Sequence, residues 1–349
     1  MGLGVLPLAV LVVALTAQPA ARPPEEIVAE LEGGIEEAPM PEHVRGQMKP
    51  GFREGLEDLN KRKFALVLEL YEAAPDHDKL VKLLPQRWQF TGARDPWTVL
   101  RETASALEQP LLRQELRIEA AFYHAAAMGT TNRPDPGKAI PAIERFMEMA
   151  PGDNRAARLL LGAARMSEDP DFKLELYRRA LRLFPDAPVN RYTPGKIRQI
   201  EAIGEPFELD FTCAATGGDV SVQKTLRGKV VVIVFWATER VPAVVDVARM
   251  RRLYDRYRDR GVEFIGVSLD DPKEKGGLNK LRWFVGINGV AWPQYYQGAG
   301  AYSEFSTGWG VDELPTVFVV NPEGRLHTVN GRRKLEEIIA ELLARRDRA

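Results

Sequence analysis

The segment 235–243 (FWATERVPA) holds the charged side chains best placed for chemistry, directly after an apolar run. Glu239 and Arg240 are adjacent there, and Pro242 follows at the predicted start of a helix. Arginine makes paired hydrogen bonds to a carboxylate or phosphate, and a helix N-terminus adds backbone donors. The pair therefore suggests a site for an anion or for the carboxylate of a peptide.

Cys213 is the only cysteine among the 349 residues. A single thiol excludes a disulfide framework, a cysteine-based zinc site and a dithiol cycle within one chain. Residues 211–214 (FTCA) predict an edge strand packed on a domain, where a buried thiol acts as a small apolar group. The alternative is a lone redox-sensing thiol. The histidines are scattered without ligand spacing, so we expect no metal and no cofactor: His43, His77, His124 and His327.

The composition is that of a soluble globular protein, with 45% hydrophobic and 28% charged residues. Lysine and arginine total 48 against 49 for aspartate and glutamate, which gives no electrostatic footprint for nucleic acid. The local basic run 249–260 contains aspartates at helical spacing and predicts a solvated helix face. We therefore expect no nucleic-acid partner.

Residues 3–16 form an apolar stretch of 14 residues before the first charged side chain, Arg22. As a helix this stretch would extend about 21 Å, short of the roughly 30 Å hydrocarbon core of a bilayer. Small residues and prolines follow, so we expect a signal peptide over about residues 1–20. The expectation is an exported protein, periplasmic or otherwise extracytoplasmic, with no integral membrane span in its mature form. An uncleaved N-terminal anchor is the alternative.

The segment 24–200 has apolar residues at helical spacing and few alternating runs, which predicts an all-α domain. Helices that end on an apolar residue and proline recur, and Pro151 and Pro185 stand 34 residues apart. That period resembles tetratricopeptide repeats, with a degenerate signature and two or three units. The alternative is a helical hairpin array without a binding groove. Stacked helical pairs leave a concave surface, so this domain is predicted to bind a partner.

The pattern changes near residue 204 to alternating strands and helices. The run 229–236 (KVVVIVFW) predicts a central strand covered on both faces. Residues 242–260 have apolar side chains at helical spacing, which predicts an amphipathic helix. The segment 262–269 is predicted to form the next strand. Further elements are expected at the end of the chain: a helix at 278–287, strands at 316–320 and 325–329, and a helix at 334–344.

Several motifs occur together in this half of the chain: LRGKV at 226–230, FWAT at 235–238, FIGVS at 264–268, WPQ at 292–294, WGV at 309–311, LPT at 314–316 and NPEG at 321–324. With them, residues 203–345 resemble thioredoxin-fold redoxins of the extracytoplasmic TlpA/ResA-like type. The resemblance implies an α/β thioredoxin-like domain following the helical one.

The resemblance also fixes where an active site would lie. The family exchanges thiols and disulfides through a W-C-x-P-C motif, whose cysteines fall on Arg240 and Ala243 of this chain and whose tryptophan falls on Glu239. Pro242 of the motif is retained, and Pro315 occupies the place of the family's cis-proline. Arginine and alanine can neither attack sulfur nor form a disulfide, so the dithiol mechanism is excluded.

The backbone beside the cis-proline of this fold pairs with an extended peptide, which is a form of strand addition. The predicted peptide groove comprises Trp236, Glu239, Arg240, Pro242, Leu314, Pro315 and Thr316. The alternative is that Pro315 is present only because its turn requires it. The aromatic residues of this half are predicted to serve in packing: Trp283, Trp292, Tyr295, Tyr296 and Trp309.

The sequence therefore predicts an exported thioredoxin-like protein without a catalytic dithiol that binds a protein or peptide partner. One alternative is a thiol-disulfide oxidoreductase that uses Cys213 with a partner thiol. The other is a structural role, in which the thioredoxin-like domain caps the helical array.

Overall fold

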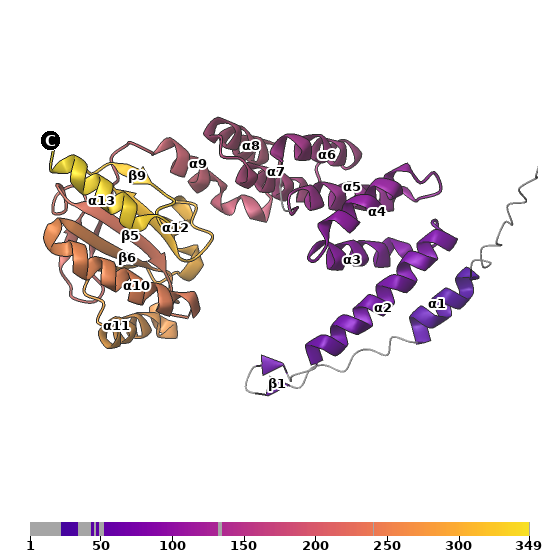
Figure 1. Cartoon of the computed structure of the whole chain (residues 1–349), viewed down its shortest axis with the longest axis horizontal. Helices are drawn as coiled ribbons and strands as arrows, with labels where there is room; N and C mark the ends of the chain where they lie inside the picture. The colour runs from indigo at the N-terminus through magenta and orange to yellow at the C-terminus, as the bar shows by residue number, and fades with distance from the viewer. Residues whose placement is uncertain are drawn as a thin grey trace, which may run out of the picture. The chain divides into compact units, whose positions relative to one another are not determined.

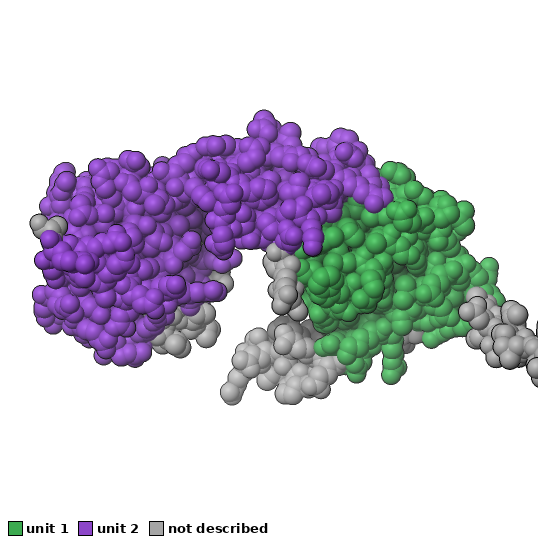
Figure 2. All heavy atoms as spheres, turned by 45° about the horizontal axis from the view of Figure 1, so that its top comes forward, with its two compact units in different colours: residues 1–133 green, residues 134–349 purple. Residues whose placement is uncertain are grey.

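The computed structural model describes residues 22–33, 43–44, 47–48, 52–131, 135–239 and 241–348. The predicted signal peptide and Arg240 lie outside these residues. The chain forms two compact units, residues 1–133 and 134–349, which Figure 2 colours separately. The predicted boundary near residue 203 falls inside the second unit.

In its described residues, the first unit is helical apart from one short two-stranded ladder. The long helix α2 packs against α1 and α3, and α5 packs against α3 and α4. Asp95 accepts a hydrogen bond from the Thr98 amide at the start of α4, in the manner of an N-cap. The elements are α1 (Pro24–Gly33), β1 (His43–Val44), β2 (Gln47–Met48), α2 (Phe52–Ala73), α3 (Leu80–Gly92), α4 (Pro96–Glu108) and α5 (Gln114–Met128).

The second unit begins with four further helices, and α7 packs against both α6 and α8 (Figure 1). Two of them start alike: Asp135 and Asp169 cap α6 and α8, and a proline follows each aspartate. The helical region predicted from apolar spacing is confirmed. These elements are α6 (Pro136–Met149), α7 (Arg155–Met166), α8 (Pro170–Leu183), the 3-10 turn η1 (Pro188–Tyr192) and α9 (Thr193–Glu201).

The rest of the second unit, called the α/β domain here (residues 203–346), is built on a five-stranded sheet in the order β7-β6-β5-β8-β9. The three strands β5, β6 and β7 run parallel, whereas β8 and β9 run antiparallel to their neighbours. The strands are β5 (Val230–Trp236), β6 (Val262–Ser268), β7 (Gln294–Tyr296), β8 (Thr316–Val320) and β9 (Leu326–Thr328).

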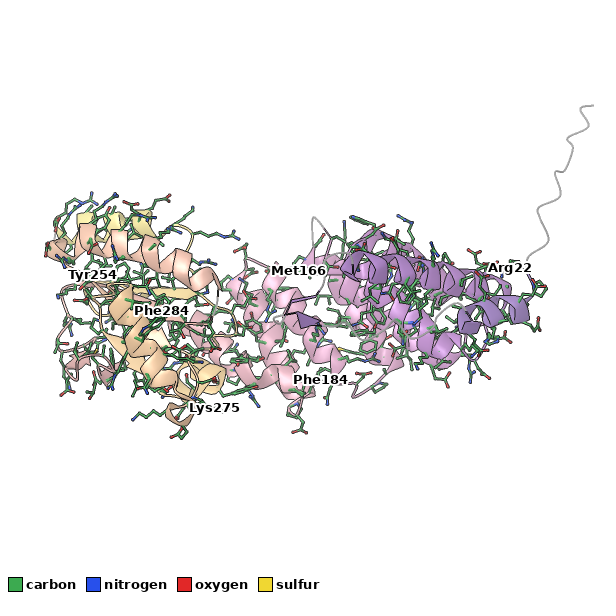
Figure 3. The ribbon with its side chains drawn as sticks, turned by 90° about the horizontal axis from the view of Figure 1, so that it is seen from below. Arg22, Met166, Phe184, Tyr254, Lys275 and Phe284 are labelled. Carbon is green, nitrogen blue, oxygen red and sulfur yellow. The ribbon has the colours of Figure 1, made fainter. Side chains whose placement is uncertain are left out.

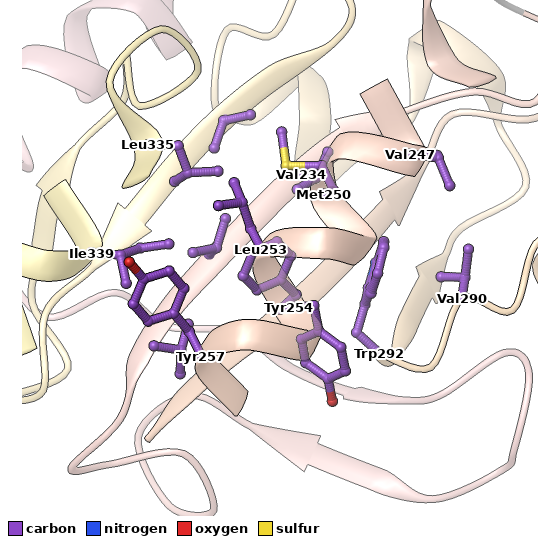
Figure 4. Packing of buried hydrophobic residues seen from close by; sticks show 14 of the residues in the cluster. Val234, Val247, Met250, Leu253, Tyr254, Tyr257, Val290, Trp292, Leu335 and Ile339 are labelled. Carbon is purple, nitrogen blue, oxygen red and sulfur yellow. The ribbon is translucent and has the colours of Figure 1, made fainter. Parts of the chain in front are cut away.

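The central strand β5 is buried along its whole length, as its continuous apolar run predicts. Alternate residues point to opposite faces, so Val232 and Val234 join one apolar cluster, whereas Ile233 and Phe235 join the other. Helices α10 and α13 cover the first face (Figures 1 and 4). The helices of this face are α10 (Val241–Tyr257), α11 (Gly277–Ile287) and α13 (Leu335–Arg346).

The second face is covered by a hairpin and by the short helix α12 (Glu304–Gly308). The hairpin pairs β3 (Asp210–Thr212) with β4 (Asp219–Ser221) in a separate two-stranded ladder. The strand predicted at 211–214 is present as β3, which ends at Thr212, one residue before Cys213. The Gly217 amide donates to the Cys213 carbonyl and turns the chain into the hairpin, while the Ala214 amide donates to the Gln294 carbonyl of β7. Three 3-10 turns complete the domain: η2 (Arg258–Arg260), η3 (Lys273–Lys275) and η4 (Gly300–Tyr302).

Candidate functional site

The site predicted from sequence lies at the carboxyl end of β5, where the chain passes into α10. Ala237 is buried, Thr238 is half-buried and Glu239 is exposed. Arg240 lies outside the described residues, and Pro242 and Ala243 belong to the first turn of α10. Residues 237–239 are called the Glu239 loop below.

A buried carboxylate that sequence reasoning missed holds the Glu239 loop. Asp270, only 4% exposed, accepts hydrogen bonds from the Thr238 amide at 2.9 Å and the Thr238 hydroxyl at 2.6 Å. Its second oxygen accepts from the Ser268 hydroxyl at 2.7 Å. A buried charge needs such partners, because an unpaired one costs several kcal/mol. The signal in the sequence is an aspartate two residues after the end of β6, since parallel strands end at the same edge of a sheet.

Glu239 forms an ion pair with Lys280 of α11. The hydrogen bond from Lys280, and then its charge, lower the pKa of Glu239, and the pKa of Lys280 is raised in return. Both side chains are largely exposed, so solvent screens the pair. The described partner of Glu239 is thus a lysine from another helix, which the sequence did not indicate.

The second part of the predicted site is Leu314, Pro315 and Thr316, and residues 309–315, which lead into Thr316, are called the Pro315 loop below. The peptide bond between Leu314 and Pro315 is cis. Pro315 is buried, while Leu314 and Thr316 are half-buried. Thr316 begins β8 directly opposite Phe235 of β5, so this loop and the Glu239 loop meet at one edge of the sheet.

The helices at the start of the second unit hold the Pro315 loop. The Asp312 carboxylate pairs with Lys196 of α9 and Arg165 of α7, each at 2.6 Å. The Gln199 amide donates a 2.5 Å hydrogen bond to the Trp309 carbonyl. These contacts fix the stretch that leads into Pro315 from the helical side.

Two glycines allow this close approach of helix and loop. A Cβ atom on Gly195 of α9 would lie 2.5 Å from the Gly310 Cα and 2.7 Å from the Thr307 carbonyl oxygen. Gly310 itself has φ +63°, a conformation that favours glycine. The backbones of α9 and the Pro315 loop therefore touch without intervening side chains.

Trp236, one of the predicted groove residues, lies in the apolar core. Its side chain is 4% exposed and packs with Phe284, with ring centroids 5.2 Å apart. Its indole nitrogen donates to the Gln294 side-chain oxygen at 3.2 Å. Trp236 thus anchors the strand beneath the Glu239 loop.

Cys213 follows β3 and lies beside Gln294 of β7, not at the start of α10. The thiol belongs to the apolar cluster on the face opposite α10 and is 4% exposed. Burial raises the pKa of the Cys213 thiol, but hydrogen bonds from Thr216, Gln294 and Ala215 outweigh burial, so the pKa lies below its ordinary value. The Gln294 amide is 3.4 Å from the sulfur.

No helix in the described part of the chain is long and apolar enough to span a membrane. Among the same residues, no group of three or more histidine, cysteine, aspartate or glutamate side chains is arranged to hold a metal ion. The site is thus a pair of loops at a sheet edge, held by a buried carboxylate and by neighbouring helices. It contains a charged pair and lacks a described nucleophile.

This fold and site define a thioredoxin-like domain, and comparison with known proteins agrees. Residues 203–329 match the AhpC/TSA family. The thiol-disulfide oxidoreductase ResA of Halalkalibacterium halodurans is 26% identical over 147 residues, covering 42% of this chain and 78% of that protein. ResA of Bacillus subtilis is 27% identical over 127 residues, covering 36% of this chain and 66% of that protein.

Similar solved structures also align with part of the chain. A thioredoxin-like protein from Bacteroides vulgatus is 26% identical with a TM-score of 0.35, covering 40% of this chain and 86% of that one. A thiol-disulfide oxidoreductase from Bacteroides fragilis is 20% identical with a TM-score of 0.33, covering 38% of this chain and 98% of that one. The C-terminal part thus matches the AhpC/TSA family model over residues 203–329 and is similar to ResA proteins, in a chain that has one cysteine and no CxxC pair.

Proposed function

We propose that this protein is a redox-inactive thioredoxin-like module that binds a protein or peptide partner. The thiol content of the chain carries the proposal. The only thiol, Cys213, is buried on the sheet face opposite α10. The positions that hold the two catalytic cysteines in TlpA/ResA-like redoxins are Arg240 and Ala243 in this chain. Thiol–disulfide exchange needs an accessible thiolate and a second thiol that resolves the mixed disulfide. The binding part of the site remains in the Pro315 loop.

Insulin reduction by dithiothreitol tests the redox part of this proposal. The natural protein should give no turnover above that of the reagent alone. The double variant Arg240→Cys/Ala243→Cys should gain turnover, because it places two thiols at the start of α10, where the helix dipole lowers a thiol pKa. Arg240→Ser/Ala243→Ser is the matched control. Turnover by the natural protein equal to that of the cysteine variant would refute the proposal.

Peptide selection tests the binding part. Extended peptides selected from a displayed library against the full-length protein should protect the backbone amides of Glu313, Leu314 and Thr316 from hydrogen exchange, because strand addition uses main-chain hydrogen bonds. Peptides that bind with no protection at these residues would argue against the groove at Pro315.

The helical region supplies a second binding surface in this proposal. The capping aspartates Asp135 and Asp169 stand 34 residues apart, which supports a tetratricopeptide-like arrangement of α6 to α9. Protection of exposed α6–α9 amides by a selected partner would support this role. A partner that protects the α/β domain alone would favour the helices as a structural support and the thioredoxin-like domain as their cap.

The second candidate is an oxidoreductase that uses Cys213 with a partner thiol. The lowered pKa of this thiol favours it, because the thiolate is the reactive form. Burial opposes it, since an attacking thiolate must reach the other sulfur. Insulin turnover that disappears in Cys213→Ser would establish this candidate in place of the first.

Export is also part of the proposal and rests on the apolar segment 3–16, outside the described residues. The mass of the N-terminal peptide from the mature protein checks it. Removal of about the first 20 residues supports a cleaved signal. An intact N-terminus in the membrane fraction would support the anchor instead.

A further inference from the structure

Helix α11 has an inner and an outer face. Leu281, Phe284 and Val285 are buried in the cluster that also holds α10. On the opposite face Lys280, Trp283 and Ile287 follow one another at steps of three and four residues, which places them on one stripe of the helix. Figure 3 shows Phe284 within the domain and Lys275, just before α11, at its rim.

The stripe exposes two large apolar side chains together. Trp283 is 66% exposed and Ile287 is 60% exposed. Trp283 is more exposed than the other five tryptophans, of which four are buried and Trp97 is 53% exposed. The prediction that Trp283 serves in packing is therefore wrong, since nothing in the described chain covers it. Exposed apolar side chains that adjoin one another, with tryptophan among them, are typical of binding surfaces.

Cations surround the stripe. At its carboxyl end Arg251 of α10 donates to the Asn288 carbonyl at 2.9 Å, and on its flank Arg282 donates to the Ala214 carbonyl at 2.9 Å. Lys273 and Lys275 precede the helix in η3. Within the described residues none of these four cations has a carboxylate at ion-pair distance. Their positive charge therefore remains available to an acidic partner.

The positive charge around the stripe also determines which kind of partner can bind there. A second copy of this chain, docked stripe to stripe, would bring these cations against one another and be repelled. A segment that carries carboxylates beside an apolar row would meet the cations and cover the two apolar side chains. The stripe from Lys280 to Ile287 spans about 10 Å, or two helical turns, which suits the anchors of one helix.

We propose that Trp283 and Ile287 dock an amphipathic helix of a partner protein, with acidic residues of that helix facing Arg251, Arg282 and the η3 lysines. At the amino end of the stripe, Lys280 already contacts Glu239. A bound helix thus reaches the edge of the Glu239 loop. The surface is distinct from the groove at Pro315 and does not depend on peptide binding there.

A synthetic helical peptide tests the proposal on the full-length protein. The probe is an 18-residue fluorescent peptide with leucines at helical spacing and glutamates on both flanks, measured by anisotropy. Trp283→Ala should weaken binding at least tenfold, because a central tryptophan anchor typically dominates such an interface. Ile287→Ala should weaken it about threefold. Trp97→Ala, which removes the other exposed tryptophan, is the matched control and should change the affinity less than twofold.

Charge variants and alternative probes complete the test. Arg251→Glu/Arg282→Glu should weaken binding strongly at low salt and less at high salt, because screening removes the attraction. A peptide with lysines in place of the glutamates should not bind.

Three results would overturn the proposal. One is equal affinity of the natural protein and Trp283→Ala for the acidic peptide. Another is that the protein binds vesicles of phosphatidylcholine with one-third phosphatidylglycerol in a way that requires Trp283, but does not bind the acidic peptide. The third is Trp283-dependent dimerisation in sedimentation. Leu314→Asp, which alters the groove at Pro315, should leave the affinity for this acidic peptide unchanged. The proposal for the α11 stripe and the proposal for the groove can therefore be refuted separately.

Discussion

The two loops that meet at the end of β5 are held in different ways. Within the α/β domain, Asp270 holds the Glu239 loop through two hydrogen bonds from Thr238, and a third from Ser268 of β6 fixes the Asp270 carboxylate. The Pro315 loop is held by helices α7 and α9 through Asp312, Trp309 and the glycine contact. None of these contacts uses the two positions of the missing cysteines. The difference shows that each loop has its own support, which is a buried carboxylate for one and the neighbouring helices for the other.

The largest expected effect is at Asp270. Asp270→Ala leaves the Thr238 amide, the Thr238 hydroxyl and the Ser268 hydroxyl without an acceptor, and should cost about 3 kcal/mol of unfolding free energy. Urea denaturation measures the loss, and hydrogen exchange should rise at residues 237–239 more than at 309–313. The neighbour Asp271→Ala, which is exposed, should cost under about 0.5 kcal/mol. Equal losses in the two variants would show that the buried carboxylate does not hold the loop.

Gly195→Ala tests the other loop and should cost about 2 kcal/mol, because the added methyl group meets backbone atoms that cannot move aside easily. Here the exchange rates should rise at residues 309–313 and stay unchanged at 237–239. Gly162→Ala in α7 is the matched control. Its added methyl group meets nothing within 4 Å, and alanine should stabilise the helix by roughly 0.5–1 kcal/mol. Wild-type stability in Gly195→Ala would remove the argument for close backbone contact.

Asp312→Ala should have a smaller effect on the same loop, about 1 kcal/mol. The Asp312 side chain is 18% exposed, but its partner Arg165 is 56% exposed, so solvent screens part of the attraction. Glu313→Ala, at the exposed neighbouring carboxylate, should be close to neutral. If thermal unfolding shifts equally in both variants, Asp312 does not clamp the loop.

The smallest effect concerns the pair of Glu239 and Lys280. Because the folded pKa of Glu239 is lowered, the pair stabilises the protein above the ordinary glutamate pKa, and this contribution is lost as the pH falls through the folded value. A carboxyl titration by nuclear magnetic resonance should show a higher Glu239 pKa in Lys280→Ala and at high salt. An unchanged pKa in Lys280→Ala would mean that the ion pair does not form in solution.

The elements of the α/β domain could be predicted because each has a local period. The run 229–236 and the spacing of Met250 and Tyr254 fix a doubly covered strand and an amphipathic helix, and both are confirmed. Asp270, Gln294 and Gly195 could not be predicted as supports of the site. Their partners lie far away along the chain, and nothing in a local pattern records a contact between distant segments.

Exposure was equally hard to predict. Trp283 and Trp309 are both predicted to serve in packing, yet Trp309 is 2% exposed and Trp283 is 66% exposed. The difference arises from the face of α11 on which Trp283 lies and from the packing of Trp309 on Phe207, 4.8 Å between ring centroids. Apolar character alone did not separate a core residue from a surface one.

The contact between Gly195 and Gly310 has a consequence for how this protein can be divided. A fragment that begins at residue 203 would lack α7 and α9, so Asp312 would lose both cations and the backbone of Gly310 would be bared to solvent. A fragment that begins at residue 135 retains every one of these contacts. The thioredoxin-like part is thus not expected to be stable without these helices, and a fragment that contains it should begin before α6.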